Sequence, residues 1–131
     1  MHNRLSLAVL LFLSAGLVVS AWAESSDDAA LIAKGKRIYL KCQSCHDITE
    51  TKLDRIGPNL KGIVGRKVAS VEGFPRYSKT LRALNSVWDD ESLSAWLEDP
   101  ESMTPGTTMA FIGIPKPEDR KALIAYMKSA K

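Results

Sequence analysis

The sequence predicts a small all-α domain in which a few helices are joined by long loops. Apolar residues recur at helical spacing in four stretches, at residues 29–41, 78–84, 90–97 and 117–128. The long stretches between them contain little of the residue-by-residue alternation that is typical of strands. The chain has 131 residues, which is the length of one small domain.

The N-terminus is predicted to be a secretory signal peptide, residues 1–23, and not part of the fold. Arg4 supplies a basic start, residues 5–19 are almost wholly apolar, and Ala21-Trp22-Ala23 forms a cleavage site. A retained membrane anchor is the alternative, but the apolar run is short for a span and the cleavage site follows it directly. We therefore expect cleavage after Ala23, export to the periplasm, no membrane span in the mature protein, and a single domain over residues 24–131.

Capping residues support the two helices nearest the C-terminus. Asp89 or Asp90 can cap the helix predicted at 90–97, because a short acidic side chain accepts hydrogen bonds from free backbone N–H groups. Pro117 suits the first turn of the helix predicted at 117–128, where no backbone donor is needed. These two helices should therefore begin close to the predicted residues.

Residues 42–46 read Cys-Gln-Ser-Cys-His, and they are the most informative motif in the chain. A C-x-x-C-H run is typical of covalent haem attachment, because two thiols bond to the porphyrin vinyl groups and the next imidazole can reach the iron. A thioredoxin-like cysteine pair and half of a zinc site are the alternatives.

The histidine count separates these alternatives. The chain has two histidines, and His2 leaves with the signal peptide, so the mature protein keeps only His46 beside the two cysteines. A structural zinc site takes its ligands from two separated pairs, and a thioredoxin-like pair lies in a βαβ context. The mature sequence has no second pair of cysteines or histidines, and no convincing strand pattern flanks the motif. The motif therefore predicts one haem c, attached covalently through Cys42 and Cys45, with His46 as an iron ligand.

A second iron ligand must come from a methionine if it comes from this chain, because no other histidine remains. Methionine paired with histidine is usual in electron-carrying cytochromes. Met127 lies in an amphipathic helical stretch and reads as core packing, whereas Met103 and Met109 lie in a segment rich in proline, glycine and threonine. Spacing alone does not separate Met103 from Met109.

Further motifs flank the haem motif, the first before it and the others after it in order. They are Gly35 and Tyr39, Gly57-Pro58-Asn59-Leu60, Gly65-Arg66-Lys67, Gly73-Phe74 with Tyr77, Trp88, Pro105-Gly106-Thr107-Thr108-Met109 with Phe111, and Leu123-Ile124-Ala125-Tyr126. In this order and spacing the sequence resembles the class I c-type cytochromes, the family of mitochondrial cytochrome c and its small soluble bacterial relatives. The likeness runs from about residue 31 to 130. It implies a single cytochrome c domain, with helices and long loops wrapped around one covalently bound haem.

The resemblance also implies roles for individual residues. It selects Met109 over Met103 as the sixth ligand, and it implies that the Pro58 carbonyl accepts the ring N–H of His46. It also implies close contact between the first and last helices at Gly35, with Tyr39 packing near Leu123 and Tyr126.

A buried haem propionate needs hydrogen-bond donors or a cation around it. Arg66, Tyr77 and Trp88 supply a guanidinium, a phenol and an indole N–H, so we expect them beside the propionates. Phe74 and Tyr77 are separated by one residue more than the resemblance leads us to expect. Thr107 has two equally supported roles, which are donation to a propionate and capping of the turn before Met109.

These features predict a periplasmic single-haem electron carrier that cycles between Fe(II) and Fe(III), with no catalytic side chain, acting as a monomer on redox partner proteins. A dedicated subunit of one periplasmic dehydrogenase or oxidase is the alternative, and a haem enzyme or gas sensor would need an open sixth position. The net charge of +3 and the scattered basic residues do not indicate a surface that binds nucleic acid. The resemblance implies a ring of lysines around the haem edge for acidic partners. Here that docking face is weakened, because the chain keeps Lys41, Lys67 and Lys116 but has Glu101, Ser102 and Thr108 near the distal loop.

Overall fold

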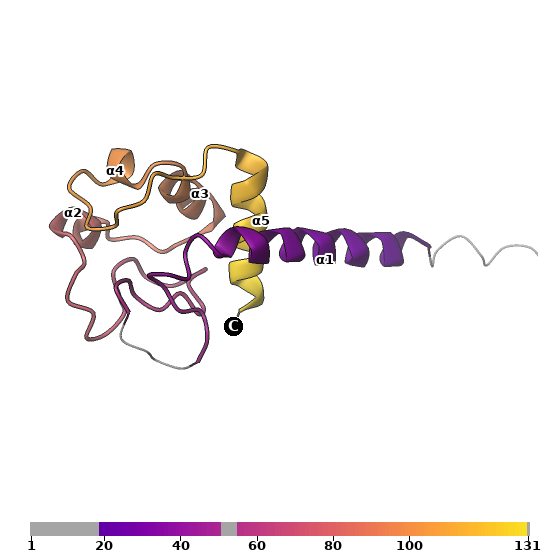
Figure 1. The fold of residues 1–131 in the computed structure, drawn as a ribbon, viewed down its shortest axis with the longest axis horizontal. Helices are drawn as coiled ribbons and strands as arrows, with labels where there is room; N and C mark the ends of the chain where they lie inside the picture. Colours follow the sequence, from indigo (N-terminus) through magenta and orange to yellow (C-terminus); the bar gives the residue numbers. More distant parts are fainter. Residues whose placement is uncertain (1–18, 51–54, 131) are drawn as a thin grey trace, which may run out of the picture.

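The structure, a computed structural model, describes residues 19–50 and 55–130, and these form helices and long loops (Figure 1). The helices are α1 (Val19–Tyr39), α2 (Lys79–Ala83), α3 (Asp90–Glu98), α4 (Pro100–Met103) and α5 (Pro117–Ser129). Within the described ranges the only β-type pairing is an isolated antiparallel bridge between Lys67 and Val87. The prediction of an all-α fold is therefore confirmed.

The first and last helices cross each other, and Figure 1 shows the crossing near the C-terminal end of α1. Gly35 lies at the crossing, where an added Cβ would overlap the backbone carbonyl of Ala122 on α5. The rings of Tyr39 and Tyr126 pack with their centroids 5.4 Å apart. The close contact predicted for Gly35 and Tyr39 is confirmed, and it fixes where α1 delivers the chain to the haem motif.

The bounds of α1 differ from the predicted 29–41. The helix begins at Val19 and includes residues 19–28, which contain neither glycine nor proline to end it. It ends at Tyr39, because the chain then enters tighter turns that run through the haem motif. Most of the predicted signal peptide, residues 1–18, lies outside the described residues, so cleavage after Ala23 stays a prediction. No helix in the described part of the chain is both long and apolar enough to cross a membrane.

The other predicted helices are confirmed to within a residue or two, and α4 was not predicted. Asp89 caps α3 in a reciprocal capping box with Ser92, and Pro117 opens α5. The short α4 begins with Pro100 directly after Asp99, whose side chain accepts the Ser102 N–H. Aspartate followed by proline is a helix-start signal, so this element could have been found in the sequence.

The core lies between α3, α5 and the loops. Leu123 on α5 is fully buried, and the indole rings of Trp88 and Trp96 pack with centroids 5.6 Å apart. The loops between α1 and α2 and between α4 and α5 close over this core. Together they leave a cavity that the helices alone would not form.

Candidate haem site

One mostly apolar cavity of about 270 Å³ brings together residues from widely separated segments. Every predicted site residue lines it: Cys42, Cys45, His46, Pro58, Arg66, Tyr77, Trp88, Thr107 and Met109. Leu81 on α2 and Trp96 on α3 add apolar surface that sequence reasoning did not assign to the site. The cavity therefore has the composition expected for a flat, largely apolar ligand with a few polar groups.

The haem motif forms a helix-like turn at one end of this cavity. The N–H of Cys42 donates to the Tyr39 carbonyl at 2.8 Å, and the N–H of His46 donates to the Cys42 carbonyl at 2.9 Å. This turn presents both thiols and the imidazole to the same space. Burial raises the pKa of the Cys42 thiol to about 11, so this thiol stays protonated at neutral pH while it is free.

The imidazole of His46 is fixed by one hydrogen bond and one close backbone contact. Its Nδ1 lies 2.8 Å from the Pro58 carbonyl oxygen, which can only accept, so Nδ1 carries the proton. Burial lowers the pKa of His46, and the bond to Pro58 opposes that shift without reversing it. A neutral ring with Nδ1 protonated leaves the Nε2 lone pair available for a metal ion.

Gly57 packs against the face of the same ring. A Cβ at this position would lie 2.6 Å from Nδ1 and 2.7 Å from Nε2 of His46, which is closer than any side chain allows. The sequence contains this glycine beside Pro58, but its contact with the imidazole was not predicted. Only the absence of a side chain lets the loop approach the ring so closely.

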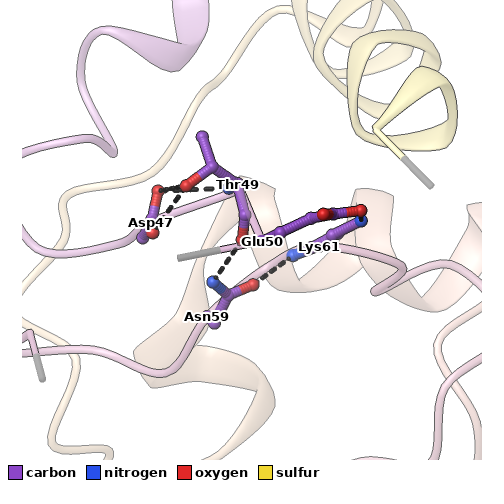
Figure 2. A network of polar contacts seen from close by, with 5 residues as sticks. All are labelled: Asp47, Thr49, Glu50, Asn59 and Lys61. Carbon is purple, nitrogen blue, oxygen red and sulfur yellow. Dashed lines mark hydrogen bonds and ion pairs between the residues drawn. The ribbon is translucent and has the colours of Figure 1, made fainter. Parts of the chain in front are cut away.

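A polar network braces the loop that carries Pro58 (Figure 2). The Asp47 carboxylate accepts the N–H and the hydroxyl of Thr49, and the Thr49 carbonyl accepts Asn59 Nδ2 at 2.9 Å. Asn59 Oδ1 accepts the N–H of Lys61 at 2.7 Å, and Lys61 pairs with Glu50. These contacts tie the segment after His46 to the segment after Pro58, which fixes the distance between the imidazole and its acceptor.

Arg66 is a half-buried cation on the cavity wall. Its Nη1 donates to the Lys61 carbonyl at 3.0 Å and its Nη2 donates to the Asn59 carbonyl at 2.8 Å. Burial lowers the pKa of Arg66, and no carboxylate among the described residues forms an ion pair with it. A partly desolvated guanidinium with only carbonyl partners suits an anionic group in the cavity.

Tyr77 and Trp88 lie on the same wall. The Tyr77 hydroxyl accepts the N–H of Val71 at 3.2 Å, which leaves its own O–H available as a donor. Its ring packs edge-on against Phe74, with centroids 4.8 Å apart, so the unusual spacing of these aromatics still brings Tyr77 to the cavity. Trp88 is buried, and its backbone N–H donates to the Arg66 carbonyl.

Met109 faces the cavity from the loop between α4 and α5. Its N–H donates to Thr107 Oγ1 at 3.3 Å, so Thr107 caps the turn before Met109, as one of its two predicted roles required. Met103 packs against the core and does not line the cavity. Met127 is 3% exposed and reaches the wall from α5 as part of the core.

These donors fit a covalently attached haem, since two thiols, a neutral imidazole, a thioether and a partly desolvated cation share one apolar cavity. The family model described as "Cytochrome c" matches residues 32–131. The chain belongs to the cytochrome c family. This cytochrome accordingly binds one haem c covalently, in the arrangement of Cys42 and Cys45, and carries electrons to or from redox partners.

Named relatives support this membership. The cytochrome is 39% identical over 102 residues to "Cytochrome c2" of Afifella marina, covering 76% of this chain and 82% of that protein. It is 43% identical over 100 residues to "Cytochrome c-550" of Ancylobacter novellus, covering 74% and 92%. It is 34% identical over 118 residues to "Cytochrome c-554" of Methylosinus trichosporium, covering 90% and 89%.

Proposed function

We propose that this cytochrome is a periplasmic, monomeric carrier that passes single electrons between partner proteins, with His46 and Met109 as the axial ligands of its haem. It has no enzymatic role of its own in this proposal. One observation carries the ligand assignment. His46 and Met109 line the same cavity as both cysteines, whereas Met103 lies outside it and Met127 reaches the wall only as a buried core residue of α5.

Bound haem c supplies a one-electron Fe(II)/Fe(III) couple. The polypeptide holds the imidazole through Pro58 and Gly57, and a ring fixed in this way would offer the iron the same ligand in both oxidation states. Arg66, Tyr77 and Trp88 would hold the propionates, because they bring a cation and polar donors to an otherwise apolar wall. Thr107 fixes the turn from which the Met109 thioether is offered.

A dedicated subunit of one periplasmic dehydrogenase or oxidase is the second candidate, and the exposed apolar side chains near the cavity favour it. Ile56 lines the cavity and is 62% exposed, and Ile112, three residues after Met109, is 98% exposed. Large exposed apolar side chains are typical of protein contacts. A partner that docks through them would give an electron-transfer rate that depends only weakly on salt.

The experiment is a redox titration of the protein purified from periplasm, followed by N-terminal sequencing. The proposal predicts one reversible single-electron transition and a chain that begins at Glu24. A chain that begins at Met1 would contradict the predicted processing. Rapid binding of carbon monoxide to the reduced protein at neutral pH would indicate an open sixth position, and would support a haem enzyme or gas sensor instead.

A further inference from the structure

Arg120 is a buried cation that the proposed function does not use. It lies on α5 and is 6% exposed, so its guanidinium is almost completely removed from water. Its Nε donates to Ser94 Oγ at 2.9 Å, and its Nη2 pairs with Glu98 Oε2 at 3.2 Å. Both partners lie on α3, so the Nε and Nη2 atoms of the guanidinium connect α5 to α3.

The third nitrogen of the guanidinium, Nη1, reaches the segment that follows Met109. Nη1 donates to the carbonyl oxygens of Ile114 at 2.8 Å and Pro115 at 2.9 Å. One planar side chain therefore holds two helices and one backbone segment together. A guanidinium suits this position because its donors point in several fixed directions within one plane.

The same segment is also fixed to the end of α3. The N–H of Ile114 donates to the Leu97 carbonyl at 2.7 Å, and an added Cβ on Gly113 would overlap the Glu98 carbonyl. Residues 113–115 thus form a firm anchor. Ile112, between this anchor and Met109, is 98% exposed and adds no packing of its own.

Only a short piece of chain separates this anchor from Met109. Each residue spans at most about 3.6 Å, and only the three residues 110–112 lie between Met109 and Gly113, so the chain between them has little freedom to lengthen. A displacement of the anchor is therefore transmitted to the Met109 side chain. We therefore expect loss of the anchor to let the distal loop open more often without unfolding the helices.

We propose that Arg120 is a positioning residue for the distal ligand: it clamps the end of the segment 109–115 so that the Met109 thioether stays at its site in the cavity. This inference rests on the proposed function, in which Met109 is the sixth ligand. Lysine at position 120 would keep the charge, but its single ammonium cannot reach all of these acceptors at once.

The test measures how easily an external ligand displaces Met109. The ferric holoprotein and its Arg120→Lys variant are titrated with imidazole at fixed pH, because the apparent affinity rises with the fraction of molecules whose distal side is open. We expect Arg120→Lys to bind imidazole about tenfold more tightly, which corresponds to ~1.4 kcal/mol in the opening equilibrium. Unfolding by urea is measured on the same samples.

A matched control separates positioning from general destabilisation. Gly35→Ala disturbs the α1–α5 crossing, which does not include the distal loop, and Tyr126→Leu replaces it if that variant does not fold. We expect the control to lose stability in urea while its imidazole affinity stays within about twofold of the wild type. If Arg120→Lys does not incorporate haem, Glu98→Gln weakens the same network from its exposed side, and about a threefold shift is expected.

Two results would overturn the inference in different ways. If the Arg120 variant and the control shift the imidazole affinity equally at equal loss of stability, Arg120 is a structural residue only, and the proposed function stands. If Met109→Ala keeps the methionine-to-iron absorption of the wild type, the ligand assignment itself is wrong, and the inference falls with it.

Discussion

The two sides of the cavity are built differently, and the difference indicates which ligand can move. On the His46 side, the imidazole has a hydrogen bond to Pro58, a backbone packed on its face at Gly57, and a polar network around Asn59. On the Met109 side, the Met109 N–H has only a 3.3 Å bond to Thr107, and the neighbouring Thr108 hydroxyl donates to the Arg76 carbonyl at 2.6 Å from an exposed position. A neutral hydrogen bond contributes only about 1 kcal/mol net, so the distal loop is the weaker side.

This asymmetry matches the chemistry proposed for each side. The His46 side follows directly from the covalent attachment at Cys42 and Cys45, so it is fixed in sequence as well as in space. Met109 is brought to the cavity from a distant segment, and only tertiary contacts keep it there. We therefore expect substitutions near His46 to affect haem binding and folding together, and substitutions near Met109 to affect ligand exchange first.

A glycine-to-alanine change on each side of the cavity should give the largest difference in the free energy of unfolding. Gly57→Ala should lower the free energy of unfolding by about 3 kcal/mol, because the new methyl group overlaps the His46 ring. Gly106→Ala meets no atom within 4 Å and strains only a backbone with φ of +78°, so it should lower it by about 1 kcal/mol. Urea denaturation of the two holoproteins measures both. A larger loss for Gly106→Ala would show that the distal loop is the rigid side.

Removal of a side-chain hydrogen bond on each side of the cavity should give the next largest difference in the free energy of unfolding. Asn59→Ala removes a bond to the Thr49 carbonyl and one from the Lys61 N–H, and should lower the free energy of unfolding by about 2 kcal/mol. Thr107→Val removes the single long bond to the Met109 N–H, and should lower it by about 0.5 kcal/mol. Equal losses in urea would remove the proposed difference between the sides.

The Tyr39 hydroxyl is a smaller contribution to the His46 side. It donates to the His46 carbonyl at 3.0 Å and so ties the haem motif back to α1. Tyr39→Phe keeps the ring contact with Tyr126 and should lower the free energy of unfolding by about 1 kcal/mol. Tyr126→Phe is the matched control, because it removes a phenol hydroxyl from the same ring pair. If the control costs as much, the bond to His46 contributes nothing specific.

The smallest expected effect concerns pH and the start of α3, whose far end anchors the distal segment. Hydrogen bonds from Ser92 lower the pKa of Asp89, so the folded protein favours the ionised carboxylate. This stability is present above the ordinary pKa of about 3.9 and is lost as pH falls through the lower folded value. Asp89→Asn keeps a capping oxygen without the titration. The stability difference between wild type and variant should therefore shrink from pH 7 to pH 3, as thermal unfolding can measure.

Much of the fold and of the site could be predicted because local signals carry them. The capping aspartate at 89, the proline at 117 and the C-x-x-C-H spacing act over a few residues, and each was found in the expected place. The choice of Met109 over Met103 needed the family resemblance, because both methionines lie in similar loop sequence. Met109 lines the cavity and Met103 does not.

The contacts that could not be predicted are those made by tertiary packing. Nothing near Gly57 indicates that its neighbour in space is the face of His46, and nothing near Arg120 indicates four acceptors from two other segments. An arginine three residues after Pro117 reads as an ordinary exposed helix residue. Its burial depends on where α3 and the distal segment meet α5, and only the assembled fold defines that place.

The ligand assignment is tested most directly by the weak methionine-to-iron absorption band at the red end of the visible spectrum of the ferric protein. Met109→Ala and Met103→Ala are compared with the wild type at neutral pH, and the two variants remove the same group from neighbouring segments. We predict that Met109→Ala loses the band and lowers the reduction potential, because the thioether raises it, while Met103→Ala keeps both. A Met109→Ala protein that retains the band would contradict the assignment of Met109 as the distal ligand.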